Sequence, residues 1–265
     1  MPIQFSHQDK PFIRFLQYLT RESGRILLNY FKKNLEVELK ADATPVTDAD
    51  RRAEERLRQL IEKEFPEHGI IGEEFGEKNA TSEYVWLIDP LDGTKSFVSG
   101  VPLFGTLLAL LKKGKPLIGV IANPILKTFL FGDNELTLLN NRPVRTSSCQ
   151  ILSEAILCTT SPRSSWQLHQ PQNFIRLANS VKLFRGWGDC FGYQLLACGK
   201  IDIMLDPIMN RWDSLPLIPI IRGSGGVITN WQGADPVCDP SSIVAATAGL
   251  HKEVIRILNQ SQEGA

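Results

Sequence analysis

The sequence has few of the residues that build soft-metal and redox sites. Only four histidines occur, scattered along the chain, so a histidine-rich zinc site is not expected. The five cysteines are odd in number and form no C-x-x-C pair. This usage favours reduced thiols in a cytosol-like compartment over a disulfide framework.

The sequence also lacks net charge and long apolar runs. The 29 Lys and Arg residues balance 29 Asp and Glu residues, so no overall field favours nucleic acid or an acidic membrane surface. No apolar run reaches the roughly 18 residues of a membrane span. The first residues lack the basic-then-apolar order of a signal peptide. We therefore expect a cytoplasmic protein without nucleic-acid or membrane partners.

Motifs of several enzyme classes are absent. No G-x-x-x-x-G-K-[ST] occurs, which excludes a P-loop kinase, and no G-x-S-x-G marks a serine hydrolase. A haloacid-dehalogenase-type phosphatase needs a second aspartate two residues after the nucleophile, whereas Asp89 and Asp92 are three apart. Asp48 and Asp50 follow a polar loop instead of a buried strand. Trapping an aspartyl-phosphate would test this alternative.

The 265 residues contain 43% hydrophobic and 22% charged residues, which suits a folded protein. Helical spacing over about 11–34 and beyond Asp50 precedes a β meander over about 106–139. Strands and helices then alternate, which predicts an α/β fold. A helix should follow Asp213, with a kink at Pro219.

The change of pattern near 140–148 predicts a boundary between two lobes of one compact catalytic unit. We expect an N-terminal α+β lobe with metal-binding motifs over 1–145. A C-terminal α/β lobe would span 146–265.

Three acidic groups end an apolar strand-like run or begin a helix. They are Gly72-Glu73-Glu74, Asp89-Pro90-Leu91-Asp92-Gly93-Thr94 and Trp212-Asp213. Mg²⁺ prefers carboxylate oxygens and shares its coordination shell with substrate phosphate. Two such ions, about 3.5–4 Å apart, can activate water and neutralise a leaving oxygen. The three groups together predict a magnesium site for phosphate chemistry.

The D-P-L-D-G-T segment offers several ligands at once. Asp89 and Asp92 flank a Pro-containing turn, so both can face one site, and the Leu91 carbonyl lies between them. Gly93 and Thr94 would offer backbone N–H groups to phosphate and a hydroxyl to orient water.

Each acidic group also has a plain structural explanation. D-P-x-D-G suits an ordinary turn, and Glu73-Glu74 suits a solvated loop. Asp213 fits a helix N-cap, and Thr47-x-x-Asp50 fits a capping arrangement. The occurrence of three such groups at strand ends and helix starts favours the functional interpretation.

The run W-L-I-D-P-L-D-G-T-K-S-F, Trp86 to Phe97, resembles the signature W-x-I-D-P-[IL]-D-G-T of the inositol monophosphatase family. That family belongs to the fructose-1,6-bisphosphatase-like superfamily. Further matches, in order along the chain, are the P-V-T-x-x-D segment (45–50), G-E-E (72–74), Trp212-Asp213 and Gly225-Gly226. The resemblance implies a layered α-β-α-β-α sandwich and a homodimer.

The resemblance also implies roles for individual residues around two or three Mg²⁺ ions. Glu73, Asp89 and the Leu91 carbonyl would ligate the first ion. Asp89, Asp92 and Asp213 would ligate the second, and Glu73 would help to hold a third, weaker one.

The resemblance likewise implies direct in-line attack by water on a small phosphorylated metabolite, with Glu73, Thr94 and Asp50 as catalytic residues. Thr94, linked to Asp50, would position the attacking water. Gly93 and Thr94 would bind phosphate.

Three segments narrow the resemblance to histidinol-phosphate phosphatases: Gly93 to Phe97, Pro102 to Leu111, and Gly188 to Tyr193. Asp189 stands where inositol phosphatases usually have a neutral hydroxyl, and it would suit the ammonium and imidazole of L-histidinol phosphate. A helix N-cap is the alternative role for Asp189. Asp206 is a second candidate for binding the polar end of the substrate.

The same motifs are compatible with other functions. Inositol-1-phosphate and other sugar or nucleotide phosphates are alternative substrates within the family. A non-catalytic regulator that binds a phosphometabolite is the alternative of another class, and it predicts a lost metal ligand, although none is missing. Arg185 fits a phosphate contact or a surface charge, and Arg211 stands where related enzymes often have Pro.

Overall fold

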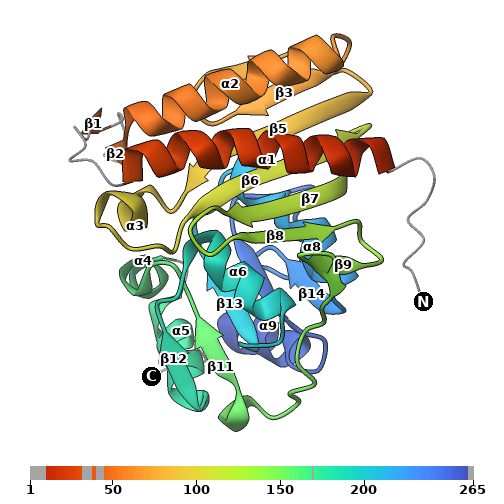
Figure 1. Cartoon of the computed structure of the whole chain (residues 1–265). Coiled ribbons are helices and arrows are strands. Elements are labelled where there is room, and N and C mark those ends of the chain that lie inside the picture. Colours follow the sequence, from red (N-terminus) through yellow and green to blue (C-terminus); the bar gives the residue numbers. More distant parts are fainter. Residues whose placement is uncertain (1–9, 32–37, 40–44, 169, 262–265) are drawn as a thin grey trace.

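Helices and sheets alternate in five layers (Figure 1). The computed structural model describes residues 10–31, 38–39, 45–168 and 170–261. Two long helices cover an eight-stranded sheet, a middle layer of shorter helices follows, and a five-stranded sheet with its own outer helices completes the stack. This arrangement confirms the predicted α-β-α-β-α sandwich.

The outer layer consists of α1 (Lys10–Phe31) and α2 (Asp48–Glu64). Apolar residues at helical spacing on both helices pack against Trp86 and its neighbours in the sheet. Thr47 caps α2: its hydroxyl accepts a hydrogen bond from Ala49 N (3.1 Å), and its backbone N–H donates to Asp50 (2.8 Å). The capping arrangement predicted from the sequence is therefore present.

The eight-stranded sheet contains the predicted meander. It is antiparallel except where β3 runs parallel to β5. Its strands, in spatial order, are β10 (Arg142–Pro143), β9 (Thr137–Leu139), β8 (Thr128–Gly132), β7 (Lys115–Asn123), β6 (Gly105–Lys112), β5 (Tyr84–Asp92), β3 (Gly69–Gly72) and β4 (Gly76–Lys78).

Side chains of this sheet alternate between two cores. Trp86 and Leu108 face α1 and α2, whereas Leu87 and Leu107 face the middle layer. Burial on both faces explains why these strands read as nearly continuous apolar runs.

The middle layer consists of α6 (Asp189–Ala197), α7 (Arg211–Ser214) and α8 (Leu217–Gly223). Paired glycines let α8 lie directly on the sheet: a Cβ on Gly119 would be 1.9 Å from the Pro216 carbonyl oxygen, and one on Gly132 would be 2.4 Å from Ile220 Cα. Any larger residue at either position would push α8 away.

The expectation of one helix kinked at Pro219 was wrong. The chain breaks between α7 and α8, around Leu215 and Pro216. Pro219 lies in the first turn of α8, where helix N–H groups have no partner within the helix, so proline costs little there.

The second sheet is mixed. Strands β12 (Leu183–Arg185), β11 (Ile156–Cys158) and β13 (Ile203–Asp206) are parallel, and β15 (Ile243–Thr247) and β14 (Gly226–Thr229) complete it antiparallel. Helices α5 (Pro171–Ser180) and α9 (His251–Leu258) pack together on its outer core. The sequence did not predict β14.

The remaining elements are short. Helix α3 (Thr94–Val98) follows β5, and the 3₁₀ helix η1 (Leu152–Glu154) and α4 (Pro162–Gln167) flank β11. Strands β1 (Glu38–Leu39) and β2 (Pro45–Val46) form a small separate ladder. The alternating polar and apolar residues from Glu36 to Lys40 predict a strand; β1 covers two of them, and the rest lie outside the described residues.

The two sheets divide the chain near the predicted boundary. The first sheet ends at Pro143 and the second begins at Ile156, and we propose the lobe boundary between them. One core, which includes Leu107 and Met204, joins both sheets. Among the described residues, none of the helices has the length and apolar character needed to cross a membrane.

Candidate functional site

A β-bulge at the end of β5 brings two aspartates to one face of the sheet. Asp89 pairs with Leu107 and Asp92 with Gly105, so β5 has one more residue than β6 between these two pairs. Side chains three apart on a regular strand point to opposite faces, but one inserted residue restores the same face. Asp89 and Asp92 can therefore both face the middle layer.

A buried hydrogen-bond chain fixes this bulge from the other side of the sheet. Thr106 donates to the Pro90 carbonyl at 2.9 Å. The Ser23 hydroxyl of α1 lies 2.7 Å from the Thr106 hydroxyl. Thr106 has one proton, already given to Pro90, so Ser23 is the donor to Thr106. The outer helix thus holds the turn that carries the aspartates.

Glu73 reaches the site on the turn between β3 and β4, which runs beside β5. Its N–H donates to the Ile88 carbonyl at 3.1 Å. The buried Glu54 of α2 accepts hydrogen bonds from Glu74 N (2.7 Å) and Phe75 N (3.2 Å), and it pairs with Arg58 at 2.7 Å. A carboxylate inside α2 therefore holds the backbone that follows Glu73.

Gly72 explains why this motif begins with glycine. A Cβ at this position would lie 2.0 Å from Glu54 Oε1. Arg58 also donates to the Gly76 carbonyl, which closes the turn from its far end.

Asp213 enters from the middle layer on α7, which packs against β5. Its Oδ2 accepts a hydrogen bond from Asn210 N at 2.8 Å, in a capping box that starts the helix. The N-cap role expected for Asp213 is not observed: Asn210 is the N-cap, and Asp213 stands at the third helical position, where its carboxylate completes the capping box. Asp213 also interacts directly with Asp89.

Glu73, Asp89, Asp92 and Asp213 line one cleft of about 610 Å³. Burial, followed by repulsion from neighbouring carboxylates, raises the pKa of Asp89 and of Asp92 well above the usual range. Burial is also the main cause that raises the pKa of Asp213 to about 7. The structure thus brings to one cleft the four carboxylates that the sequence predicts to meet.

Such a cluster needs protons or cations to compensate its charge. In the described part of the chain, no three His, Cys, Asp or Glu side chains already surround a single point as metal ligands. The acidic side chains instead interact in pairs, Glu73 with Asp89 and Asp89 with Asp213. Hard oxygen donors in a buried anionic cleft fit a divalent cation such as Mg²⁺.

The residues after Asp92 form a compact turn at the same cleft. Gly93 has φ 87°, a left-handed conformation that glycine adopts without strain, and it is the N-cap of α3. The Thr94 hydroxyl lies 3.0 Å from the Leu91 carbonyl and 3.3 Å from Asp50 Oδ1. Burial raises the pKa of Asp50 to about 6. The predicted link between Thr94 and Asp50 is therefore present.

The start of α6 lies against Asp92. The Cys190 N–H donates to Asp92 Oδ2. Asp189 is the first residue of α6, with Gly188 as the N-cap, so the alternative role of Asp189 as N-cap is not observed. Its carboxylate lies 3.4 Å from the Ser96 hydroxyl, and its N–H donates to the Thr160 hydroxyl at 2.7 Å.

Asp206 lines a smaller cavity of about 270 Å³, which shares lining residues such as Asp189 with the cleft. It accepts hydrogen bonds from Thr159 and Tyr193 side chains (3.2 and 2.9 Å) and from the Thr160 N–H and hydroxyl (2.8 and 3.0 Å). These contacts tie the 159–160 segment to β13. A direct contact with substrate remains a prediction for Asp206.

Asp189 lines both cavities, and so does Lys95. Among the residues that line the smaller cavity, Lys95 is the only cation and four are aspartates: Asp92, Asp189, Asp206 and Asp213. Arg185 and Arg211 line neither: Arg185 donates to the Phe184 carbonyl, and Arg211 pairs with Glu77 at 2.6 Å. Because Asp92 and Asp213 are predicted metal ligands and Asp206 already accepts four hydrogen bonds, Asp189 is the carboxylate left to compensate a cationic group in the smaller cavity.

Sequence reasoning missed three supporting residues. Glu54 gave a signal, because it falls on the apolar stripe of α2 beside Leu57 and Ile61. Thr106 gave none, since its partners Ser23 and Pro90 are distant in sequence. Thr160 also gave none, because it lies in a segment for which the sequence pattern predicted neither a helix nor a strand.

Three comparisons bear on the family. The model of the inositol monophosphatase family matches residues 8–263. The bifunctional phosphatase IMPL2 of Arabidopsis thaliana is 42% identical over 87% of this chain and 67% of its own. A histidinol-phosphatase of Chlorobaculum parvum is 35% identical over 95% of this chain and 98% of its own.

A solved structure shows the same fold. An inositol monophosphatase from Zymomonas mobilis superposes with a TM-score of 0.84 and 32% identity, covering 96% of this chain and 99% of that one. The chain belongs to the inositol monophosphatase family and is a phosphoric monoester hydrolase.

Proposed function

We propose that this hydrolase cleaves L-histidinol phosphate in a Mg²⁺-dependent reaction with direct attack by water. The observation that carries the proposal is the single cleft shared by Glu73, Asp89, Asp92 and Asp213, with Asp189 at its border. Together with the Leu91 carbonyl, the first four would hold two or three Mg²⁺ ions. The bound ions supply Lewis-acid activation of water and neutralise the leaving oxygen.

The chain's own residues orient the reactants. Gly93 and Thr94 offer N–H groups to the phosphate, and Asp50 fixes the Thr94 hydroxyl that positions the water. A bond forms between water oxygen and phosphorus while the ester P–O bond breaks. The products are inorganic phosphate and L-histidinol: the attacking water loses one proton to solvent and the leaving oxygen takes one, so the reaction consumes only water.

Charge around the smaller cavity supports this substrate over inositol phosphate. L-Histidinol phosphate carries an ammonium group and an imidazole, whereas inositol carries only hydroxyls. Because both oxygens of Asp206 already accept hydrogen bonds from the protein, Asp189 is the better placed partner for the ammonium. The similarity to a histidinol-phosphatase over nearly the whole chain supports the same assignment.

The test is a panel of kcat/KM values with Mg²⁺. The substrates are L-histidinol phosphate, inositol-1-phosphate, fructose-1,6-bisphosphate and 3′-phosphoadenosine-5′-phosphate. We expect L-histidinol phosphate to be preferred by about tenfold or more, since a charge-assisted contact discriminates by at least that factor. Equal values across the panel would contradict this substrate but leave the phosphatase assignment intact.

Inositol-1-phosphate is the second candidate, because an inositol monophosphatase is 32% identical over the whole fold. It would be the better substrate if Asp189 only positions α6. A non-catalytic role would require an inert protein that still binds Mg²⁺, and hydrolysis of a generic phosphomonoester excludes that role.

We also propose a cytoplasmic homodimer. All five cysteines are free thiols, which suits a reducing compartment. Val101, Trp166 and Trp187 expose 39–47% of their surface, and a partner subunit would cover such apolar groups. Sedimentation equilibrium gives the mass, and a monomer of 29.7 kDa would contradict the dimer.

A further inference from the structure

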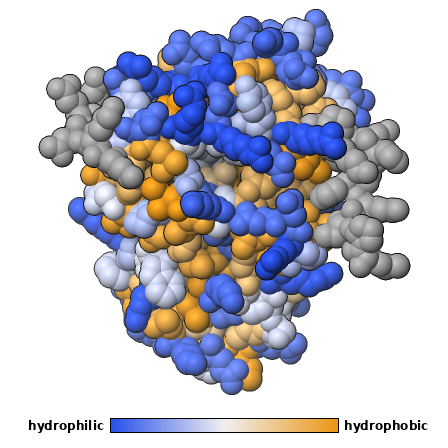
Figure 2. Space-filling view, in the orientation of Figure 1, coloured by the Kyte–Doolittle hydropathy of each residue, from blue (hydrophilic) through white to orange (hydrophobic). Residues whose placement is uncertain are grey.

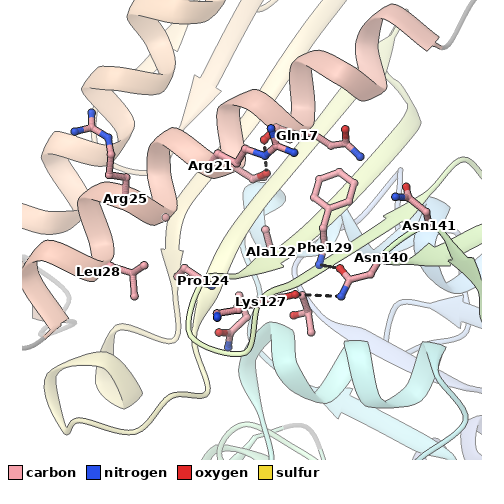
Figure 3. A pocket seen from close by; sticks show the side chains of 14 residues that line it. Gln17, Arg21, Arg25, Leu28, Ala122, Pro124, Lys127, Phe129, Asn140 and Asn141 are labelled. Carbon is pink, nitrogen blue, oxygen red and sulfur yellow. Dashed lines mark hydrogen bonds between the residues drawn. The ribbon is translucent and has the colours of Figure 1, made fainter.

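A second groove lies away from the carboxylates, between α1 and the turn that joins β7 to β8 (Figure 3). Its volume is about 540 Å³, and it shares no lining residue with either cavity of the active site. At one end α1 closely approaches the turn, because Gly24 has no side chain: a Cβ there would lie 3.0 Å from Pro124 Cβ. The size is typical of a small-molecule site.

Cations line this groove and carboxylates do not. Arg21 and Arg25 stand one turn apart on α1, and Lys127 stands on the opposite rim. Arg25 has a weak partner, Glu22, at 3.7 Å. Within the described residues, neither Arg21 nor Lys127 has an acidic partner. Because the whole chain carries no net charge, this excess of positive charge is local.

The hairpin side of the groove is held in a fixed shape. Asn140 accepts a hydrogen bond from Phe129 N at 2.9 Å and donates one to the Lys127 carbonyl at 3.1 Å. Lys127 has φ 54° and Asn141 has φ 64°, conformations that non-glycine residues seldom adopt. The two Asn140 contacts therefore preset where the Lys127 side chain leaves the backbone.

The groove also has an apolar wall, formed by Leu28, Ala122, Pro124 and Phe129. Figure 2 shows this face of the molecule, where hydrophobic surface and hydrophilic side chains alternate below α1. Gln17 on α1 and Asn141 in the turn between β9 and β10 add side-chain amides, which can donate hydrogen bonds. Cations and amides around an apolar wall fit an anionic head group attached to an apolar body.

We propose that this groove binds a small organic phosphate. The phosphate lies between Arg21 and Lys127, and its apolar or aromatic body packs against Leu28, Pro124 and Phe129. Arg binds phosphate oxygens through its fork of N–H donors, and Lys adds a point charge. A polynucleotide would need an extended basic surface, which a single groove on a neutral chain does not provide.

The test uses phenylphosphonate, which the enzyme cannot hydrolyse to phosphate and alcohol, titrated calorimetrically in EDTA so that the Mg²⁺ site does not contribute. The double variant Arg21→Gln/Lys127→Gln should bind it about tenfold more weakly or worse, because two charge-assisted contacts are lost. The matched control is Arg52→Gln/Lys115→Gln, which removes the same charge from exposed positions outside the groove. It should bind like the wild type.

Three results would overturn the site: equal binding by both double variants, no binding by the wild type, or loss of wild-type binding in Asp92→Asn. The main alternative occupant of the groove is a second copy of the chain, and light scattering tests for it. If Arg21→Gln/Lys127→Gln changes the molar mass while the wild type fails to bind phenylphosphonate, the groove contacts a second copy of the chain. The experiment needs no turnover, so its outcome is independent of the proposed substrate.

Discussion

The Thr106 hydroxyl donates a 2.9 Å hydrogen bond to the Pro90 carbonyl, inside the bulge that sets Asp89 and Asp92 on one face of β5. Neither residue touches the cleft. The Pro90 carbonyl is buried in the bulge, so it needs a hydrogen-bond donor. A contact on the face of the sheet opposite the site therefore helps to fix the positions of the two carboxylates.

Replacing Thr106 with Val should lower kcat/KM about tenfold, since the bulge would lose the contact that fixes both aspartates. It should also cost about 1–2 kcal/mol of unfolding free energy for the unsatisfied carbonyl. Thr137→Val is the matched control, because Thr137 is equally buried and donates to the Ile220 carbonyl at 2.6 Å, in the outer part of the sheet. Equal activity in the two variants would show that Thr106 serves stability alone.

Asp92→Asn should reduce activity by at least about a hundredfold and raise the melting temperature in EDTA. The rise is expected because burial and the neighbouring Asp189 and Asp213 disfavour a charge at this position. Glu55→Gln on the exposed face of α2 is the control and should change neither quantity. A lower melting temperature in EDTA would show that the cluster is not electrostatically strained.

Asp189→Asn should raise KM for L-histidinol phosphate about tenfold and leave inositol-1-phosphate unaffected, because only the first substrate loses an ionic partner. Asn is the suitable replacement, since Asp189 has φ 50° and Asn tolerates that conformation. Steady-state kinetics on both substrates measures the difference. Similar losses for both would identify Asp189 as a positioning residue for α6.

Glu54→Gln should raise the Mg²⁺ concentration for half-maximal activity several-fold, because the segment after Glu73 loses its carboxylate anchor. Glu62→Gln, on the same helix, breaks only an exposed pair with Lys78 at 2.9 Å and should leave that concentration unchanged. An unchanged Mg²⁺ requirement in Glu54→Gln would separate Glu54 from the metal site.

In EDTA, the stability of the protein should fall as pH rises from about 4 to 7. Burial raises the pKa of Asp206 from 3.8 to about 7, so between these values the folded state holds a proton that the unfolded state has lost. The stabilisation is complete below 3.8 and is lost as pH rises through 7, by up to ~1.4 kcal/mol per pH unit. Denaturant unfolding from pH 4 to 8 measures the slope, and Asp206→Asn should reduce it; Asp50, Asp92 and Asp213, whose pKa values are also raised, account for the remainder. An unchanged slope in that variant would rule out Asp206 as its source.

The sequence alone determined the order of elements and the identity of the acidic groups. Apolar periodicity located α1, α2 and the meander, since hydrophobic spacing is a local property. The resemblance to the family motifs predicted Glu73, Asp89, Asp92 and Asp213 as metal ligands, and all four lie near the end of a strand or the start of a helix. Local patterns could not place the helix break near Pro216, which follows from the close packing of α8 on Gly119 and Gly132.

Only the tertiary structure decided how those residues are supported. The bulge, the Ser23–Thr106–Pro90 chain and the Glu54 anchor all join segments that are far apart in sequence, so no local pattern contains them. No local pattern predicted the hydrogen bonds that the Thr160 and Tyr193 hydroxyls donate to the Asp206 carboxylate. The residue types alone indicated the chemistry of the site. The position and burial of each side chain, which determine its charge and its contacts, follow only from the packing of the layers.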